Sequence, residues 1–196
     1  MLRRSAEGVS IEWVQGRVQV RAGSGPDRAG HGTACAVVLC TLAPGIRLIS
    51  VHVTGEHGST DAQRLASGIR AGLELGAQLI CVPLGSQAAD LHEVVREVSE
   101  GAVCLAADPR SERVSPACEL GALPVALADG VDVARDERGV VADGHAFSGA
   151  GLPRRVPMGP SFAVARATAA LARLAEEVGL AGPSLIEEFN KKLPLV

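Results

Sequence analysis

The sequence predicts an α/β fold of three layers, in which a mostly parallel sheet carries helices on both faces. Short β-branched runs alternate with longer segments of helical periodicity, which is the pattern of parallel strands joined by crossover helices. Hydrophobic residues make up 47% of the 196 residues, yet there are only one Trp, three Phe and no Tyr. A core of Val, Leu, Ile and Ala is typical of strands that are buried on both faces. The length favours a single domain over residues 1–196.

The expected elements follow in chain order. One or two short strands are expected over 9–20, and further strands over 46–53, 79–84, 103–107 and 123–128. Helices are expected over 31–42, 60–75, 90–101, 161–178 and 184–193. Thr33 is expected to cap the first helix, and Thr60 with Gln63 forms a capping box that opens the second. Residues 129–159 are broken by Gly, Pro and charge and predict short strands at most.

Charge and hydropathy exclude several classes of function. The formal net charge is −3, the charges are mixed and no basic patch occurs, which argues against a nucleic-acid partner. No apolar run approaches the ~20 residues that span a bilayer, so no membrane partner is expected. The basic start Met1-Leu2-Arg3-Arg4 is not followed by an apolar segment, unlike a secretory signal. We expect a cytoplasmic protein, and the high Ala, Arg and Gly content suggests a bacterial source.

The five cysteines predict reduced thiols rather than disulfides or a metal site. They lie in apolar segments without C-x-x-C spacing, at Cys35, Cys40, Cys81, Cys104 and Cys118. A zinc site needs clustered ligands, and the sequence shows no such cluster. We therefore expect no metal and no cofactor.

The most informative stretch is Gly30-His31-Gly32-Thr33, at the start of the first expected helix. The glycines allow a tight turn and a close backbone approach. They place the imidazole at a helix N-terminus, at the mouth of a site rather than inside a core.

A second stretch, Gly159-Pro160-Ser161-Phe162-Ala163, places a serine at the start of the long Ala-rich helix. The first-turn amides and the helix dipole favour a negative charge near this serine. One interpretation is that Ser161 is only a helix N-cap. The other is that Ser161 is a nucleophile, because a nucleophile works with a base and His31 offers one.

With these stretches in this order, the sequence resembles the subtilisin-like serine proteases over nearly its whole length. Gly30-His31-Gly32-Thr33 resembles the motif of the family's general base, and Gly159-Pro160-Ser161-Phe162-Ala163 resembles the nucleophile motif Gly-Thr-Ser-Met-Ala. Val82-Pro83-Leu84-Gly85 resembles the substrate-binding strand. The resemblance implies that His31 takes the proton of the Ser161 hydroxyl, which attacks a peptide carbonyl. It also implies that Leu84, Gly85 and Ala107 pair with an extended peptide and line its first pocket.

Two parts of the family's machinery have no clear counterpart. The family's acid lies in Asp-x-Gly on a strand well before the histidine, where the best match here, Ala6-Glu7-Gly8, has an alanine. Asp27 is a candidate acid, but many relatives carry a second, structural Asp at that position; Glu7 and Glu12 are weaker candidates.

The second missing part is the oxyanion donor. The family has an Asn after the strand that 103–107 resembles, whereas this chain has Asp108-Pro109. Pro109 offers neither an N–H nor an amide, and Asp108 adds negative charge where negative charge must develop. In subtilisin, loss of the acid alone lowers turnover on the order of 10⁴-fold. Loss of the oxyanion Asn costs about 10²–10³-fold.

Three hypotheses follow. The first is an inactive or severely weakened subtilase homologue that binds an extended peptide or serves as a partner subunit, for example beside an active subtilase. The second is an active serine endopeptidase that uses His31 and Ser161 with an unusual or borrowed acid. The third is a structural interaction module, for which neither Ser161→Ala nor His31→Ala alters partner binding.

Overall fold

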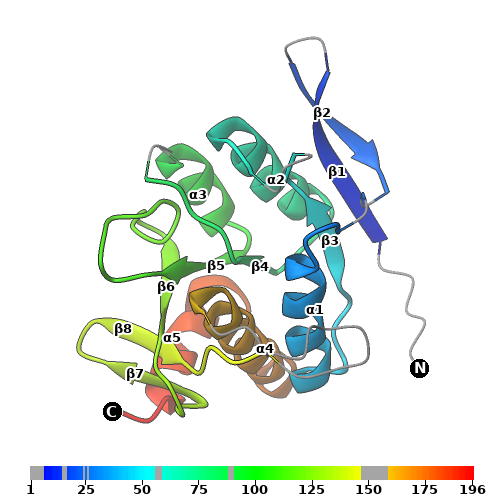
Figure 1. The fold of residues 1–196 in the computed structure, drawn as a ribbon. Coiled ribbons are helices and arrows are strands. Elements are labelled where there is room, and N and C mark those ends of the chain that lie inside the picture. The colour runs from blue at the N-terminus through cyan, green and yellow to red at the C-terminus, as the bar shows by residue number, and fades with distance from the viewer. Residues whose placement is uncertain are drawn as a thin grey trace.

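The computed structural model describes residues 7–14, 17–23, 25, 27–55, 59–87, 91–146 and 159–196. Figure 1 shows helices on both sides of the central strands, with α2 and α3 on one face and α1, α4 and α5 on the other. The predicted three-layer α/β fold with a mostly parallel sheet is therefore confirmed. None of the helices within the described ranges has the length and apolar content needed to cross a membrane.

The strands form two sheets rather than one. The larger sheet has five strands in the order β4-β5-β6-β8-β7. These are β4 (Leu79–Val82), β5 (Val103–Asp108), β6 (Ala122–Leu127), β7 (Val133–Asp136) and β8 (Gly139–Ala142). Only β7 runs antiparallel, as the partner of β8. This β7-β8 hairpin is the short-strand region expected after residue 128.

The smaller sheet has three strands in the order β2-β1-β3. The hairpin of β1 (Glu7–Val14) and β2 (Arg17–Ala22) is antiparallel, and β1 pairs in parallel with β3 (Ile49–His52). Strand β3 is shorter than the predicted 46–53 run. Strands β3 and β4 are each an edge of their sheet.

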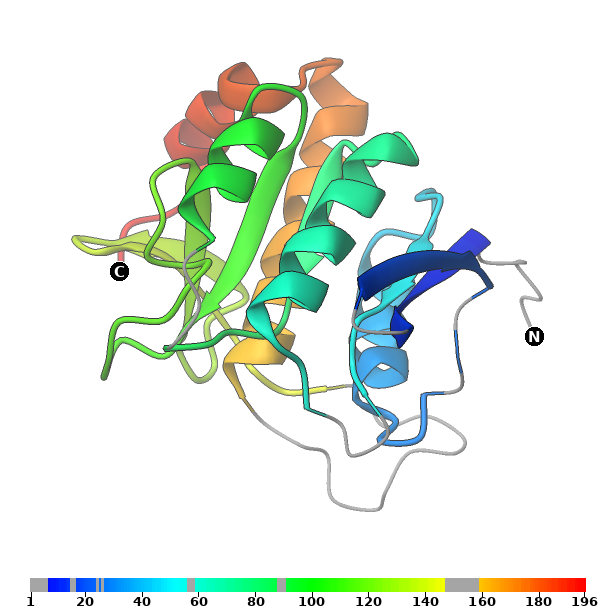
Figure 2. The ribbon, with the colours of Figure 1, turned by 90° about the horizontal axis from the view of Figure 1, so that it is seen from above.

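The helices cover both faces of the large sheet. Helix α4 (Pro160–Val178) is rich in alanine, so it lies close under the large sheet, and it contacts β4, β5, β6 and β8. Helix α5 (Gly182–Lys192) packs on α4, and Leu185 and Phe189 are buried there. Figure 2, viewed from above, shows α2 (Ala62–Glu74) and α3 (His92–Ser99) side by side on the opposite face from α4. Their buried aliphatic residues share one core cluster with β4 and β5.

Two predicted caps are wrong in detail. Helix α1 (His31–Leu42) has Gly30 at its N-cap in the left-handed region, with φ of 69°. Thr33 does not cap it; instead Thr33 donates to Asp27 from both its backbone N–H and its hydroxyl. In α2 the cap is Asp61, whose carboxylate accepts from the Arg64 N–H at 2.9 Å, and not Thr60. The Thr60 hydroxyl instead donates to the Val53 carbonyl.

Candidate functional site

The two motif helices meet at their N-terminal ends. Helices α1 and α4 pack against each other, as Figure 1 shows, and share a core cluster that includes Cys35, Val38 and Phe162. His31 is the first residue of α1 and Ser161 is the second residue of α4. The Cys35 thiol lies 3.9 Å from the Ser161 carbonyl, one turn below His31. Residues 130 positions apart in sequence therefore lie at adjoining helix tips.

The His31 imidazole is held by an aromatic contact. Its ring centroid lies 5.5 Å from that of Phe162, at an interplanar angle of 60°. Phe162 follows Ser161 directly, so the contact places the imidazole beside the start of α4. Within the described part of the chain, no hydrogen bond joins His31 to Ser161 or to a carboxylate.

The Ser161 side chain is not a helix cap. Gly159 occupies the N-cap position of α4 and makes no side-chain capping bond. The Ser161 hydroxyl donates to the Pro83 carbonyl at 2.9 Å, just beyond the end of β4. The proton that a general base would need to remove is therefore directed at a backbone carbonyl. Catalytic hydrogen bonds often form only when substrate is bound, so the pair stays a candidate.

Asp27 is engaged by the first turn of α1. Its Oδ2 accepts from the Thr33 N–H at 2.6 Å and from the Thr33 hydroxyl at 2.7 Å. Partial burial by itself raises the pKa of Asp27, but hydrogen bonds from Thr33 and from the Gly30 backbone, together with the electrostatic effect of nearby His31, outweigh it, so the net pKa lies below its usual range. The geometry favours a structural, helix-capping Asp over an acid that orients the imidazole.

The remaining candidate acids offer little more. Residue 6, where the family's acid is expected, lies outside the described residues. Glu12 lies on β1 and pairs with Arg21 of β2 at 3.2 Å, and both side chains are exposed.

The expected oxyanion region carries no amide donor side chain. Asp108 ends β5, and its Oδ1 accepts from the Arg110 N–H at 2.8 Å, which closes a tight turn around the exposed Pro109. Arg110 adopts φ of 61° and binds Asp136 of β7 through both terminal nitrogens, at 2.5 and 3.0 Å. The turn is thus fixed to the β7-β8 hairpin.

The candidate substrate-binding segments lie beside this turn. Leu84 is half-buried and Gly85 is exposed, both just after β4, and Ala107 is buried in β5. The chain itself crosses this place: Ser86 and Ser115 form an antiparallel bridge with N–H to carbonyl bonds at 2.9 and 3.1 Å. A Cβ on Gly85 would lie 2.2 Å from the Val114 side chain, so a glycine is required beneath Val114. The bridge leaves the edge before Ser86 as the place where an extended peptide would pair.

A cavity of about 620 Å³ opens next to His31. It runs between β3 and β4, and residues of α1 and α2 complete its walls. Asp27, His31, Pro83 and Leu84 line the same cavity, so it connects the site residues with the interior between the two sheets. Its lining is mostly apolar.

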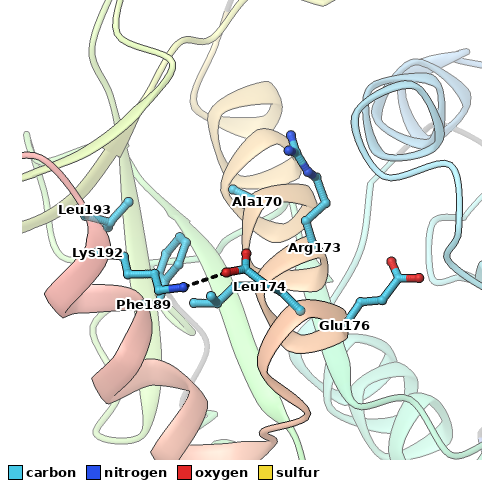
Figure 3. Close-up of a pocket in the computed structure, with 8 residues that line it drawn as sticks. Ala170, Arg173, Leu174, Glu176, Phe189, Lys192 and Leu193 are labelled. Atoms are coloured by element: carbon cyan, nitrogen blue, oxygen red, sulfur yellow. Dashed lines mark hydrogen bonds and ion pairs between the residues drawn. The ribbon is translucent and has the colours of Figure 1, made fainter.

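A second hollow, of about 460 Å³, lies between α4 and α5, away from the helix tips. Figure 3 shows Phe189 and Leu174 at its base and Lys192 reaching toward α4, where its Nζ lies 2.9 Å from Glu177. Its lining contains neither a serine nor a histidine and includes neither His31 nor Ser161, so it is not the candidate site.

The thiols near the site are poor nucleophiles. Burial raises the pKa of Cys35 to about 12, and also raises that of Cys81 to about 11 and that of Cys104 to about 12. All five cysteines are free, as predicted. A thiol with a raised pKa is protonated at neutral pH, which disfavours a cysteine nucleophile beside His31.

Three features of the site were not predicted from the sequence. Phe162 supports His31, the Pro83 carbonyl binds Ser161, and Val114 covers Gly85. Each depends on a contact between segments that are far apart in the chain, so no local sequence pattern predicts it.

Comparison with known proteins supports the fold. No protein-family model matches the sequence, and no curated protein matches it. Among solved structures, the chain is similar to the crystal structure of a cold-adapted subtilisin-like serine proteinase, with a TM-score of 0.68 and 18% sequence identity. The alignment covers 83% of this chain and 67% of that chain. The protein therefore has a subtilisin-like α/β fold.

Proposed function

We propose that this chain is a subtilisin-like peptidase homologue whose own catalysis is lost or severely weakened, and that it acts as a peptide-binding or partner subunit. The observation that carries the proposal is the hydrogen bond from the Ser161 hydroxyl to the Pro83 carbonyl. A serine becomes a nucleophile when its proton passes to a base, and here that proton is held by a backbone oxygen.

The surroundings support the same proposal. The carboxylate of Asp27 is engaged by Thr33, and the Asp108-Pro109 turn offers no side-chain amide. Without an oriented imidazole and an oxyanion donor, a serine retains only weak residual catalysis. The edge at Leu84 still offers backbone groups for an extended peptide.

The second candidate is an active serine endopeptidase. One observation favours it: His31 and Ser161 lie on adjoining helix tips, with Phe162 holding the imidazole in place. A carboxylate supplied from outside the described residues would complete the pair. A purely structural module needs neither side chain.

A fluorophosphonate probe distinguishes these candidates, because it labels only an activated serine. The wild type is compared with Ser161→Ala, His31→Ala and the matched control Ser184→Ala, which removes an exposed serine from α5. We expect no adduct on Ser161 in the wild type, together with measurable binding of an extended peptide. An adduct on Ser161 that disappears in His31→Ala but persists in Ser184→Ala would overturn the proposal in favour of the peptidase.

A further inference from the structure

Strands β3 and β4 are the facing edges of the two sheets. Each lacks a strand neighbour on the side toward the other, and no backbone hydrogen bond joins them in the described part of the chain. Both line the 620 Å³ cavity along their length, over 48–54 and 79–84. The cavity is thus bounded by two unpaired strand edges.

Helices cover this gap on both faces. On one face α2 lies across it: Gly68 approaches Val53 of the segment after β3, and Gly72 approaches Ile80 of β4. On the other face α1 contributes Cys35, Ala36 and Leu39 to the cavity wall. The gap therefore has the surroundings of an interior strand position, with helices above and below and a strand on each side.

The length of the bounding strands sets the length of the slot. Strands β3 and β4 are each four residues long, which at a rise of about 3.3 Å per residue is roughly 13 Å. An extended segment of about four residues therefore matches both edges.

Burial shows that the position is open. Interior strands of such a fold are buried throughout, and the first five residues of β5 are. In contrast, all four residues of β3 and the first three of β4 are only half-buried, although helices cover both faces. Solvent therefore reaches these strands through the gap between their edges. Backbone N–H and carbonyl groups that line an apolar cavity need partners, and a small apolar ligand supplies none.

We propose that this cavity is a slot for an extended segment of a partner polypeptide, which inserts as a parallel strand between β3 and β4. The segment joins both sheets into one through backbone hydrogen bonds. Its side chains alternate between Cys35 and Leu39 on one face and Gly68 and Ile69 on the other, so apolar residues of small and medium size fit. Helix α2 connects β3 to β4 as a crossover, so the two edges run parallel.

The carboxyl end of the slot lies at the candidate site. Pro83 follows β4 and accepts from Ser161, and His31 packs on the adjacent Phe162. A residue at the carboxyl end of the inserted strand, on the α1 side, therefore faces the imidazole. An Asp there would supply a carboxylate to His31, whose ring makes no hydrogen bond with a carboxylate among the described residues, and this part of the inference rests on the second candidate function, the peptidase that uses His31 and Ser161.

Hydrogen exchange of the full chain tests the insertion. The probe is a peptide of about seven residues, rich in Val and Ala, with an Asp near its carboxyl end and a short lysine tail for solubility. In the free protein we expect fast exchange of those amides of β3 and β4 that face the gap, since the alternate amides already pair with β1 and β5, and protection of the gap-facing amides of both strands when the peptide is bound. Matched peptides with a central proline lack one N–H and should not protect the amides of β3 and β4 from exchange.

A slot-blocking variant adds a second readout. Ala36→Phe adds a ring to the cavity wall, whereas Thr41→Phe places the same ring on the exposed side of α1. We expect Ala36→Phe to weaken peptide binding by about tenfold or more and Thr41→Phe to leave it unchanged. Slow exchange of the gap-facing amides of β3 and β4 in the free protein, protection of only one strand, or equal protection by the proline peptide would each overturn the insertion.

An Asn version of the peptide tests the carboxylate separately. If the Asp reaches His31, the Asp peptide allows fluorophosphonate labelling of Ser161 and the Asn peptide does not, with no labelling in His31→Ala. If both peptides protect β3 and β4 equally and neither allows labelling, the strand slot stands, the carboxylate role is overturned and the inactive subunit is supported.

Discussion

Asp27 is the carboxylate nearest in sequence before His31, and its hydrogen bonds favour a structural role at the start of α1 over the role of a catalytic acid. Both bonds come from Thr33, the third residue of α1, so the carboxylate satisfies one of the free N–H groups at the start of the helix. Its negative charge also lies at the positive end of the helix dipole. The same first turn that presents His31 thus depends on Asp27 for its stability.

We expect Asp27→Ala to lower the free energy of unfolding by about 1 kcal/mol near neutral pH, which is the usual cost of losing a helix cap. The pKa of Asp27 is lowered in the folded protein, so its stabilisation is present above the unfolded-state pKa of about 3.9 and is lost as the pH falls through the folded-state value. Urea unfolding of wild type and variant from about pH 7 to pH 3 measures the difference.

Asp27→Asn is the matched control, because it keeps an acceptor and loses the charge. Asp27→Asn should lower the free energy of unfolding by less than Asp27→Ala does. Because the Asn amide does not titrate, the contribution of position 27 to that free energy should not change with pH in this range. An Asp27→Ala protein that unfolds like the wild type at neutral pH would contradict the capping role.

Helix α2 shows at the scale of an element how sequence decides packing. It contains two interior glycines, which are costly in a helix, yet each faces a strand. A Cβ at Gly68 would lie 2.3 Å from Val53 Cγ1, whereas at Gly72 it would lie 3.6 Å from Ile80 Cδ1, an ordinary contact. Only the first glycine is required by the close approach of helix and strand.

We expect Gly68→Ala to destabilise the protein by about 1–3 kcal/mol, because the methyl group forces α2 away from the segment after β3. Gly72→Ala, on the same helix, should be neutral or stabilising by up to about 1 kcal/mol, since alanine favours the helix and meets no clash. Thermal or urea unfolding of the two variants gives the comparison. Equal stabilisation by both would show that helix propensity, and not the contact with Val53, governs the position.

Elements were the most predictable part of the molecule. The apolar runs at 79–84 and 103–107 and the alanine-rich run at 161–178 became β4, β5 and α4 within a few residues, because burial on two faces gives a strong local pattern. The motif of His31 and that of Ser161 were found from glycines next to helix starts. The contacts that decide their chemistry, Pro83 with Ser161 and Thr33 with Asp27, were not, because hydrogen-bond geometry is set by tertiary structure.

At the scale of the whole molecule, the division into two sheets was not predicted. The hydrophobic pattern of 46–53 indicates a strand but does not say whether its neighbour in space is the next strand in sequence. Strands β3 and β4 are consecutive in sequence, yet a cavity separates them. Among the residues that the structure describes, the three-stranded sheet is connected to the rest by side-chain packing, chiefly under α2 and around Ile11 and Val53, rather than by a ladder of backbone hydrogen bonds.

This division predicts unequal local stability. Since none of the described residues forms a strand between β3 and β4, the β2-β1-β3 sheet should open at a lower free energy than the five-stranded sheet, whose β5 and β6 pair with each other between the helix layers of α3 and α4. Native-state hydrogen exchange at increasing urea concentrations measures both free energies in one experiment. Amides of β1 and β3 should exchange through a sub-global opening, while those of β5 and β6 should exchange only through global unfolding. If all four strands shared one opening free energy, side-chain packing alone would couple the two sheets completely, and the gap would carry no energetic cost.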